Sequence, residues 1–181
     1  MVDEARLEET EGGLAPATDG WFVVNVRDAA WIRHDVLGAA CRFEGPDAPF
    51  RGLGINLRVL QPGQPNALYH EESNQEAFLV LAGECLLIVE GEERPLRAWD
   101  FVHCPAHTEH VVVGAGDGPC VVLMVGARRE DTRLRYPASE PARRHGASVE
   151  TATDSAAEAY ASLPRPEIAR PDGWKDLPWV K

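Results

Sequence analysis

Short apolar runs alternate with compact polar turns through the middle of the chain. The clearest runs are LGINLRVL (53–60), AFLVL (77–81), ECLLIVE (84–90), DFVHC (100–104), EHVVV (109–113) and CVVLMV (120–125). Runs of this length, rich in β-branched and aromatic residues, are typical of β-strands. Turn signals such as QPGQP, EGEE and GAGDG separate them, and no helix-length segment lies between them. The pattern predicts an all-β sandwich or barrel rather than a parallel α/β sheet.

The same pattern divides the chain into three regions. Residues 1–20 open with the acidic stretch MVDEARLEETEGG and predict a flexible leader. Residues 21–127 contain the strand-like runs and predict one barrel domain. Residues 128–181 are rich in proline, arginine and alanine, and they predict an arm with one short helix near 155–161 rather than a second domain.

The arm contains large aromatic residues, among them Trp174 and Trp179 in the segment DGWKDLPWVK. A solvated tail has few aromatic residues because it buries nothing that offsets its ordering entropy. We therefore expect the arm to pack on the barrel or on a dimer partner.

Charge and cysteine content narrow the range of partners and compartments. The net charge of −11 argues against binding to nucleic acid or to an anionic membrane, because both need a basic surface. The four cysteines are widely spaced without a C-x-x-C pair, which favours reduced thiols. No signal-like segment and no apolar run of membrane-spanning length is present, so we expect a cytoplasmic protein.

A polar cluster lies directly before an apolar run in YHEESNQEAFLVLAGE (69–84). Side chains alternate between the two faces of a strand, so His70 and Glu72 point the same way. If the short SNQ link folds the chain back, Glu76 can converge with them at one end of the barrel.

A second group of imidazoles lies in WDFVHCPAHTEH (99–110), where His110 begins another strand-like run. Histidine and carboxylate side chains that point inward from separate strands form the ligand set of a divalent transition metal. The sequence therefore predicts a metal site made of His70, Glu76 and His110, with Glu72 as a further candidate.

These two segments resemble the two conserved motifs of the cupin family. In the first motif, His70 matches the first histidine, Glu72 the second histidine position, Glu76 the glutamate and Gly83 the closing glycine, all at the family's spacing. In the second motif, Pro105 and His110 match the proline and the histidine. The resemblance implies a small antiparallel jelly-roll barrel.

The chain departs from the family pattern at several positions. Glu72 replaces a histidine, so the family's set of three histidines and one glutamate becomes two of each. In the second motif, Trp99, His107 and Gly114 stand where the family has glycine, glycine and asparagine. The first change alters the metal preference that the resemblance implies.

The sequence is consistent with more than one role for several side chains near the predicted site. Glu72 is a direct ligand, a hydrogen-bond acceptor for a metal-bound water, or a general base and hence the candidate catalytic residue. His103 is expected to face away from the cavity, and His107 to lie at its rim in the turn. Cys104 is expected to be a packed thiol, although a thiolate there would shift the metal towards zinc or copper.

The resemblance implies one divalent metal per chain, with Fe, Mn or Zn as the best candidates for a site with two carboxylates. It implies an enzyme acting on a small organic molecule, either a dioxygenase or an isomerase. The alternative is a metal-containing module that binds or senses a small ligand without turnover. The family also implies a homodimer, and an open sheet edge gives an independent reason for one.

Overall fold

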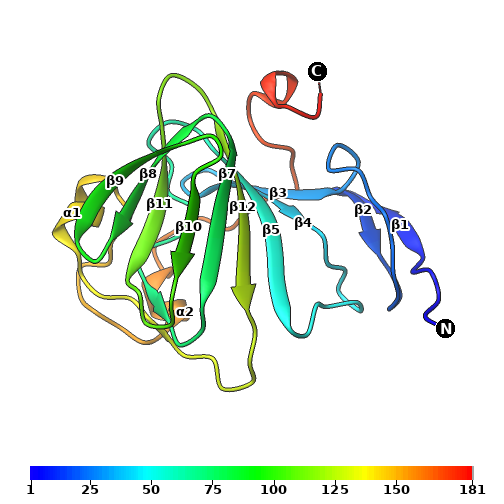
Figure 1. The fold of residues 1–181 in the computed structure, drawn as a ribbon, viewed down its shortest axis with the longest axis horizontal. Coiled ribbons are helices and arrows are strands. Elements are labelled where there is room, and N and C mark those ends of the chain that lie inside the picture. The colour runs from blue at the N-terminus through cyan, green and yellow to red at the C-terminus, as the bar shows by residue number, and fades with distance from the viewer. Residues whose placement is uncertain (181) are drawn as a thin grey trace.

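Antiparallel strands dominate the computed structural model, which describes residues 1–180 (Figure 1). In chain order the strands are β1 (Leu7–Thr10), β2 (Gly13–Pro16), β3 (Ala30–His34), β4 (Gly38–Arg42), β5 (Leu53–Leu60), β6 (Glu71–Glu72), β7 (Glu76–Ala82), β8 (Glu84–Val89), β9 (Glu92–Arg97), β10 (Phe101–Cys104), β11 (His110–Ala115), β12 (Cys120–Ala127) and β13 (Leu134–Arg135). The helices are α1 (Glu140–Arg144), α2 (Ala156–Ala159) and the 3-10 helix η1 (Trp174–Asp176). The prediction of an all-β jelly roll is confirmed.

Two sheets form the barrel. The larger has the strand order β10-β7-β12-β5-β4-β3, and the smaller has the order β11-β8-β9. Strands of both sheets contribute to one buried cluster, which includes Phe78 and Val80 from β7, Leu87 from β8 and Val112 from β11. The inner faces of the sheets therefore pack against each other, as expected for alternating strands with one apolar face.

Tight turns with glycine set the register of the barrel strands. Glu90 and Gly91 join β8 to β9 and both have positive φ, the conformation of a two-residue hairpin whose twist matches that of the strands. Gly83 joins β7 to β8 with φ 73°, and a Cβ there would lie 2.6 Å from the Pro119 carbonyl oxygen. Only glycine fits this close approach of two backbones.

The C-terminal residues cover the outer face of the larger sheet. Trp31 on β3 is fully buried between Trp174 and Trp179, at ring-centroid distances of 5.7 and 5.5 Å. Leu177, between these two tryptophans, is also buried in this cluster. Figure 1 shows this red segment beside β3.

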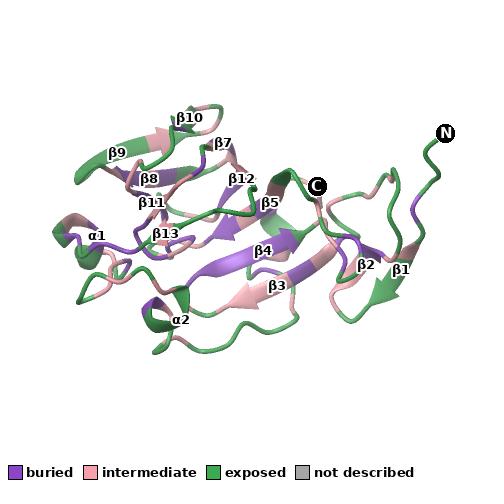
Figure 2. Cartoon of the chain, turned by 90° about the horizontal axis from the view of Figure 1, so that it is seen from below, coloured by how far each residue is buried: buried purple, intermediate pink, exposed green. Residues whose placement is uncertain are grey.

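Other parts of the region after the barrel cover different faces. Ala142 of α1 packs on Tyr69, Ile88 and Val111, behind the smaller sheet. Near α2, Ala159 packs on Leu68 and Tyr136. In Figure 2 the helices α1 and α2 appear on the same side of the barrel as β13.

Local structure differs from the sequence-based expectation in two places. Residues 1–20, expected as a flexible leader, contain the hairpin β1–β2, with Leu7 paired to Pro16. Its strands are short, and β1 is mostly exposed while β2 is not, so the hairpin carries no alternating apolar signal. In the arm, α1 and η1 accompany the expected short helix, and Ser139 caps α1 by accepting a hydrogen bond from the Ala142 N–H. Helices this short give no periodic apolar signal.

None of the helices that the structure describes has the length and apolarity needed to cross a bilayer.

Candidate metal centre

Backbone pairing brings His70 and His110 together. The two residues exchange both backbone hydrogen bonds, at 3.1 and 2.8 Å, across an antiparallel bridge. Directly opposed residues place their side chains on the same face, and the two imidazole rings lie 5.0 Å apart between centroids. His70 and His110, one from each motif, are therefore in contact only because this bridge pairs the two segments that carry them.

A hydrogen bond to the backbone orients each ring. Nδ1 of His70 lies 2.7 Å from the Leu68 carbonyl oxygen, and Nδ1 of His110 lies 2.9 Å from the Thr108 carbonyl oxygen. A carbonyl only accepts, so each Nδ1 carries the proton. When a ring is neutral, this tautomer leaves its Nε2 lone pair free to bind a metal.

Glu76, the first residue of β7, completes a group of three. Its carboxylate, His70 and His110 each offer a ligand atom, and these atoms lie within 4.8 Å of one another. Nε2 of His110 is buried without a hydrogen-bond partner, although Oε2 of Glu76 lies 3.2 Å away. Two imidazoles and one carboxylate suit Fe, Mn or Zn, and a cation would give the buried Nε2 the partner it lacks.

Burial and charge act differently on the two histidines. Burial lowers the pKa of His70, and the neighbouring His110 lowers it further. Burial also opposes the charged form of His110, but the Glu76 carboxylate outweighs it and raises the pKa of His110 above its ordinary value. His70 is therefore set up as a neutral ligand, while His110 and Glu76 attract each other electrostatically.

Glu72 lies beside this group rather than within it. Its Oε1 is 4.0 Å from Nε2 of His70, and it lines the same cavity as His70 and Glu76. Burial and the nearby Glu76 carboxylate raise the pKa of Glu72 to about 7. The side chain that stands in the family's second histidine position thus points into the site.

The site opens into a cavity of about 460 Å³, which is within the size range of small-molecule sites. Gly126 on β12 is paired with both Glu76 and Gly54, so the row of strand positions next to the carboxylate has no side chains. A Cβ on Gly126 would meet the Glu76 side chain at 3.5 Å. The two glycines therefore leave space beside Glu76.

The other candidates from the second motif do not join the group. His103 is exposed on β10, as expected from its strand phase. His107 has φ 67° in the turn, and its Nδ1 lies 3.1 Å from Oε2 of Glu71. Cys104 is buried in the core, and burial raises the pKa of its thiol to about 11. It is a packed thiol rather than a thiolate.

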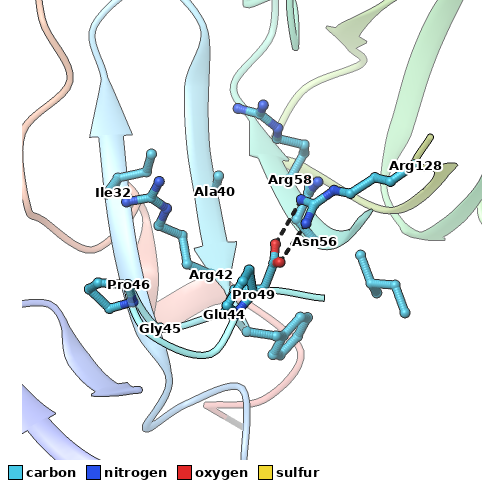
Figure 3. Close-up of a pocket in the computed structure, with 12 residues that line it drawn as sticks. Ile32, Ala40, Arg42, Glu44, Gly45, Pro46, Pro49, Asn56, Arg58 and Arg128 are labelled. Atoms are coloured by element: carbon cyan, nitrogen blue, oxygen red, sulfur yellow. Dashed lines mark hydrogen bonds and ion pairs between the residues drawn. The ribbon is translucent and has the colours of Figure 1, made fainter. Parts of the chain in front are cut away.

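Sequence reasoning missed the polar residues that line the cavity besides the candidate ligands and Glu72, namely Asn56, Arg58, Asn66, Arg128, Arg129 and Thr132. Asn56 and Arg58 lie on the inner face of β5, and Arg128 follows β12. The available signal was the pair of polar residues inside the apolar run LGINLRVL, at alternate positions. Arg128 has no such signal, because only the fold brings it to Glu44, at 2.5 and 2.8 Å (Figure 3).

The comparison with protein families agrees with the fold and the site. Residues 56–126 match the family model described as the cupin domain. This match confirms the resemblance to the cupin family seen in the two motifs. None of the curated proteins matches the chain.

The fold is shared with a solved structure. The crystal structure of a sugar phosphate isomerase of the cupin superfamily from Silicibacter pomeroyi is 21% identical, with a TM-score of 0.50, over 72% of this chain and 83% of that one. A protein of Acidithiobacillus ferrooxidans, provisionally described as a sugar phosphate isomerase, is 31% identical with a TM-score of 0.45. That match covers 46% of this chain and 55% of the other, so this chain spans about half the length of that protein. A cupin 2 conserved barrel protein of Salinispora arenicola is 24% identical, with a TM-score of 0.46, over 52% and 79% of the two chains.

Proposed function

We propose that this protein is a metal-dependent cupin enzyme that acts on a small organic molecule. The observation that carries the proposal is the group formed by His70, Glu76 and His110 at the edge of a cavity large enough for such a molecule. Two histidines and one carboxylate with open coordination positions are typical of non-haem Fe(II) oxygenases. A dioxygenase is therefore the first candidate.

Each residue has a defined part in this proposal. His70 and His110 would donate Nε2, and Glu76 would supply negative charge to the ion. The bound metal would supply Lewis-acid or redox chemistry. Glu72 projects into the cavity beside the ligands and would accept or return a substrate proton, because its carboxylate is not tied to any cation within the described residues.

The position of Glu72 favours an isomerase as the second candidate. Moving a proton between two carbons of a substrate needs a base beside the reacting atoms, and it needs no oxidant. A module that binds or senses a ligand without turnover remains the alternative, with the same metal group and no role for Glu72 in proton transfer.

Four measurements on purified protein test these proposals. Elemental analysis should find one Fe, Mn or Zn per chain. Oxygen uptake with a panel of phenols and keto acids supports the dioxygenase, while exchange of substrate C–H for solvent deuterium without oxygen uptake supports the isomerase. Ligand binding with neither signal supports the module without turnover, and a chain without metal refutes the enzyme proposal.

A further inference from the structure

Arg58 lies on the inner face of the barrel, in the middle of β5. Its neighbours Leu57 and Val59 are buried in the cluster on the outer face, with Trp31 and Leu177. Strand alternation therefore turns Arg58 inwards. An arginine is rare at such a position, because charged side chains are seldom buried unless they are paired.

Among residues 1–180, no hydrogen bond or ion pair joins the Arg58 guanidinium to another residue. Nε of Arg58 is inaccessible to solvent and has no hydrogen-bond partner, and among residues 1–180 no carboxylate lies within 4.0 Å of the side chain. Arg128, in contrast, holds Glu44 with two hydrogen bonds, and Figure 3 shows the Arg58 side chain extending away from that pair. Oδ1 of Asn56, two residues away on the same face, is also buried without a partner.

Arg58 is half-buried, and its buried, unpartnered Nε is energetically unfavourable in the ligand-free protein. Burial lowers the pKa of Arg58, although an arginine stays protonated in proteins. A buried donor without a partner loses its hydration and gains no hydrogen bond in return. An unfavourable group of this kind inside a cavity indicates a ligand that completes it.

Arg58 also lies where two cavities meet. It lines the cavity of about 460 Å³ together with His70, Glu72 and Glu76. It lines a second cavity of about 540 Å³ on the inner side of β3, β4 and β5 as well, and Asn56 and Arg128 are common to both. A ligand held at Arg58 can therefore extend towards the candidate metal ligands.

We propose that Arg58 binds an anionic group of the substrate, a carboxylate or a phosphate, while the rest of the molecule reaches the His70, Glu76 and His110 group. The inference rests on the proposed function, since it names the substrate class of the same cavity. Guanidinium matches the planar geometry of a carboxylate and the oxygens of a phosphate with paired hydrogen bonds. Oδ1 of Asn56 would accept a hydrogen bond from a hydroxyl group beside the anion.

Calorimetric titration of the full chain tests the anion site. The probes are benzoate and phenyl phosphate, with benzamide and phenol as neutral counterparts. We expect at least one anion to bind and its neutral counterpart not to bind. Arg58→Gln should lower the affinity for the anion by about 10- to 100-fold, the range expected when a hydrogen bond to a charged group is lost. Arg97→Gln, at an exposed arginine of β9, should leave the affinity unchanged.

A thermal-unfolding measurement separates a binding role from a structural role. If Arg58 serves to bind a ligand, Arg58→Met removes a partly buried cation whose Nε has no partner, and it should raise the unfolding temperature of the ligand-free protein by about 2–4 °C. A lower unfolding temperature would show that the side chain supports the fold. Equal anion affinity in Arg58→Gln and the native chain, or no anion binding at all, would also overturn the inference.

The titrations are repeated after metal removal so that the two proposals fail separately. Anion binding that depends on Arg58 in a chain with no affinity for metals supports the inference and refutes the metal-dependent function. If the chain binds one metal tightly and Arg58→Gln leaves the anion affinity unchanged, the metal-dependent function is supported and the inference about Arg58 is refuted.

Discussion

At the scale of single residues, the candidate metal centre depends on which nitrogen of each imidazole carries the proton. The Leu68 and Thr108 carbonyl oxygens accept from Nδ1 of His70 and His110, so both Nε2 atoms face the Glu76 carboxylate. The acceptors lie two residues before each histidine, so the local backbone fixes the ring orientation. The ligand set is thus arranged before any ion binds.

Replacing His110 with alanine should remove most of the metal. The variant loses one of three ligands, so its metal affinity should fall by more than the ~10- to 100-fold typical of changes outside the ligand set. Elemental analysis after dialysis measures the loss, and far-ultraviolet circular dichroism checks that the β-fold remains. His103→Ala is the matched control, because His103 lies in the same segment (99–110) as His110 but is exposed on β10. Full metal occupancy in His110→Ala would exclude His110 as a ligand.

Glu72→His restores the residue of the cupin motif beside the three-residue group. A fourth ligand with a nitrogen donor in place of a carboxylate should shift the metal content towards copper or nickel, which imidazole binds well. Competition for an equimolar mixture of divalent metals, followed by elemental analysis, measures the shift. If the metal profile does not change, the side chain at position 72 does not reach the ion.

At the scale of elements, strand pairing aligns the residues of the inner face, whereas the C-terminal segment covers the outer face. Pairing of β5, β12 and β7 aligns Arg58 with Val122 and Val80, and Gly54 with Gly126 and Glu76, on one inner face. The outer face of the same sheet is closed by Trp174, Leu177 and Trp179. We propose that residues 128–181 act as an arm that stabilises the barrel from outside.

Leu177→Ala should weaken this packing. A buried leucine replaced by alanine typically lowers the free energy of unfolding by about 2–5 kcal/mol, and Leu177 is 1% exposed. Chemical denaturation measures the loss, and trypsin should cut more quickly at Lys175 in the variant. Val23→Ala, at a side chain that is 81% exposed, should change neither. Equal stability of Leu177→Ala and the native chain would show that the segment does not hold the sheet.

At the scale of the whole molecule, the barrel has apolar groups that its own chain does not cover. Trp99 and Phe101 are 74% and 66% exposed, at the start of β10, which forms one edge of the larger sheet. An uncovered edge with apolar side chains favours pairing with another chain. The homodimer implied by the cupin resemblance therefore stays a prediction with a physical reason.

Sedimentation equilibrium measures the assembly directly. We expect a mass twice the 19.8 kDa of one chain. Phe101→Glu should favour the monomer if this edge is the interface, because the dimer would bury a charge without a partner. A native chain that sediments as a monomer at all concentrations contradicts the prediction.

The sequence determined the architecture and the first residues of the site because both depend on local patterns. Short apolar runs such as CVVLMV predict strands, and the fixed intervals from His70 to Gly83 predict a cupin motif. Turn residues show where the strands end. These signals depend only on neighbours in the chain, so one sequence is enough to see them.

Only the tertiary structure decided which side chains share the cavity. Arg58 and Asn56 lie in a run that its apolar residues identify as a strand, and nothing local says that its polar face turns inwards or lacks partners. Glu44 and Arg128 are 84 residues apart and meet through strand pairing. Contacts between distant segments arise from packing the whole sheet, so a local pattern does not contain them.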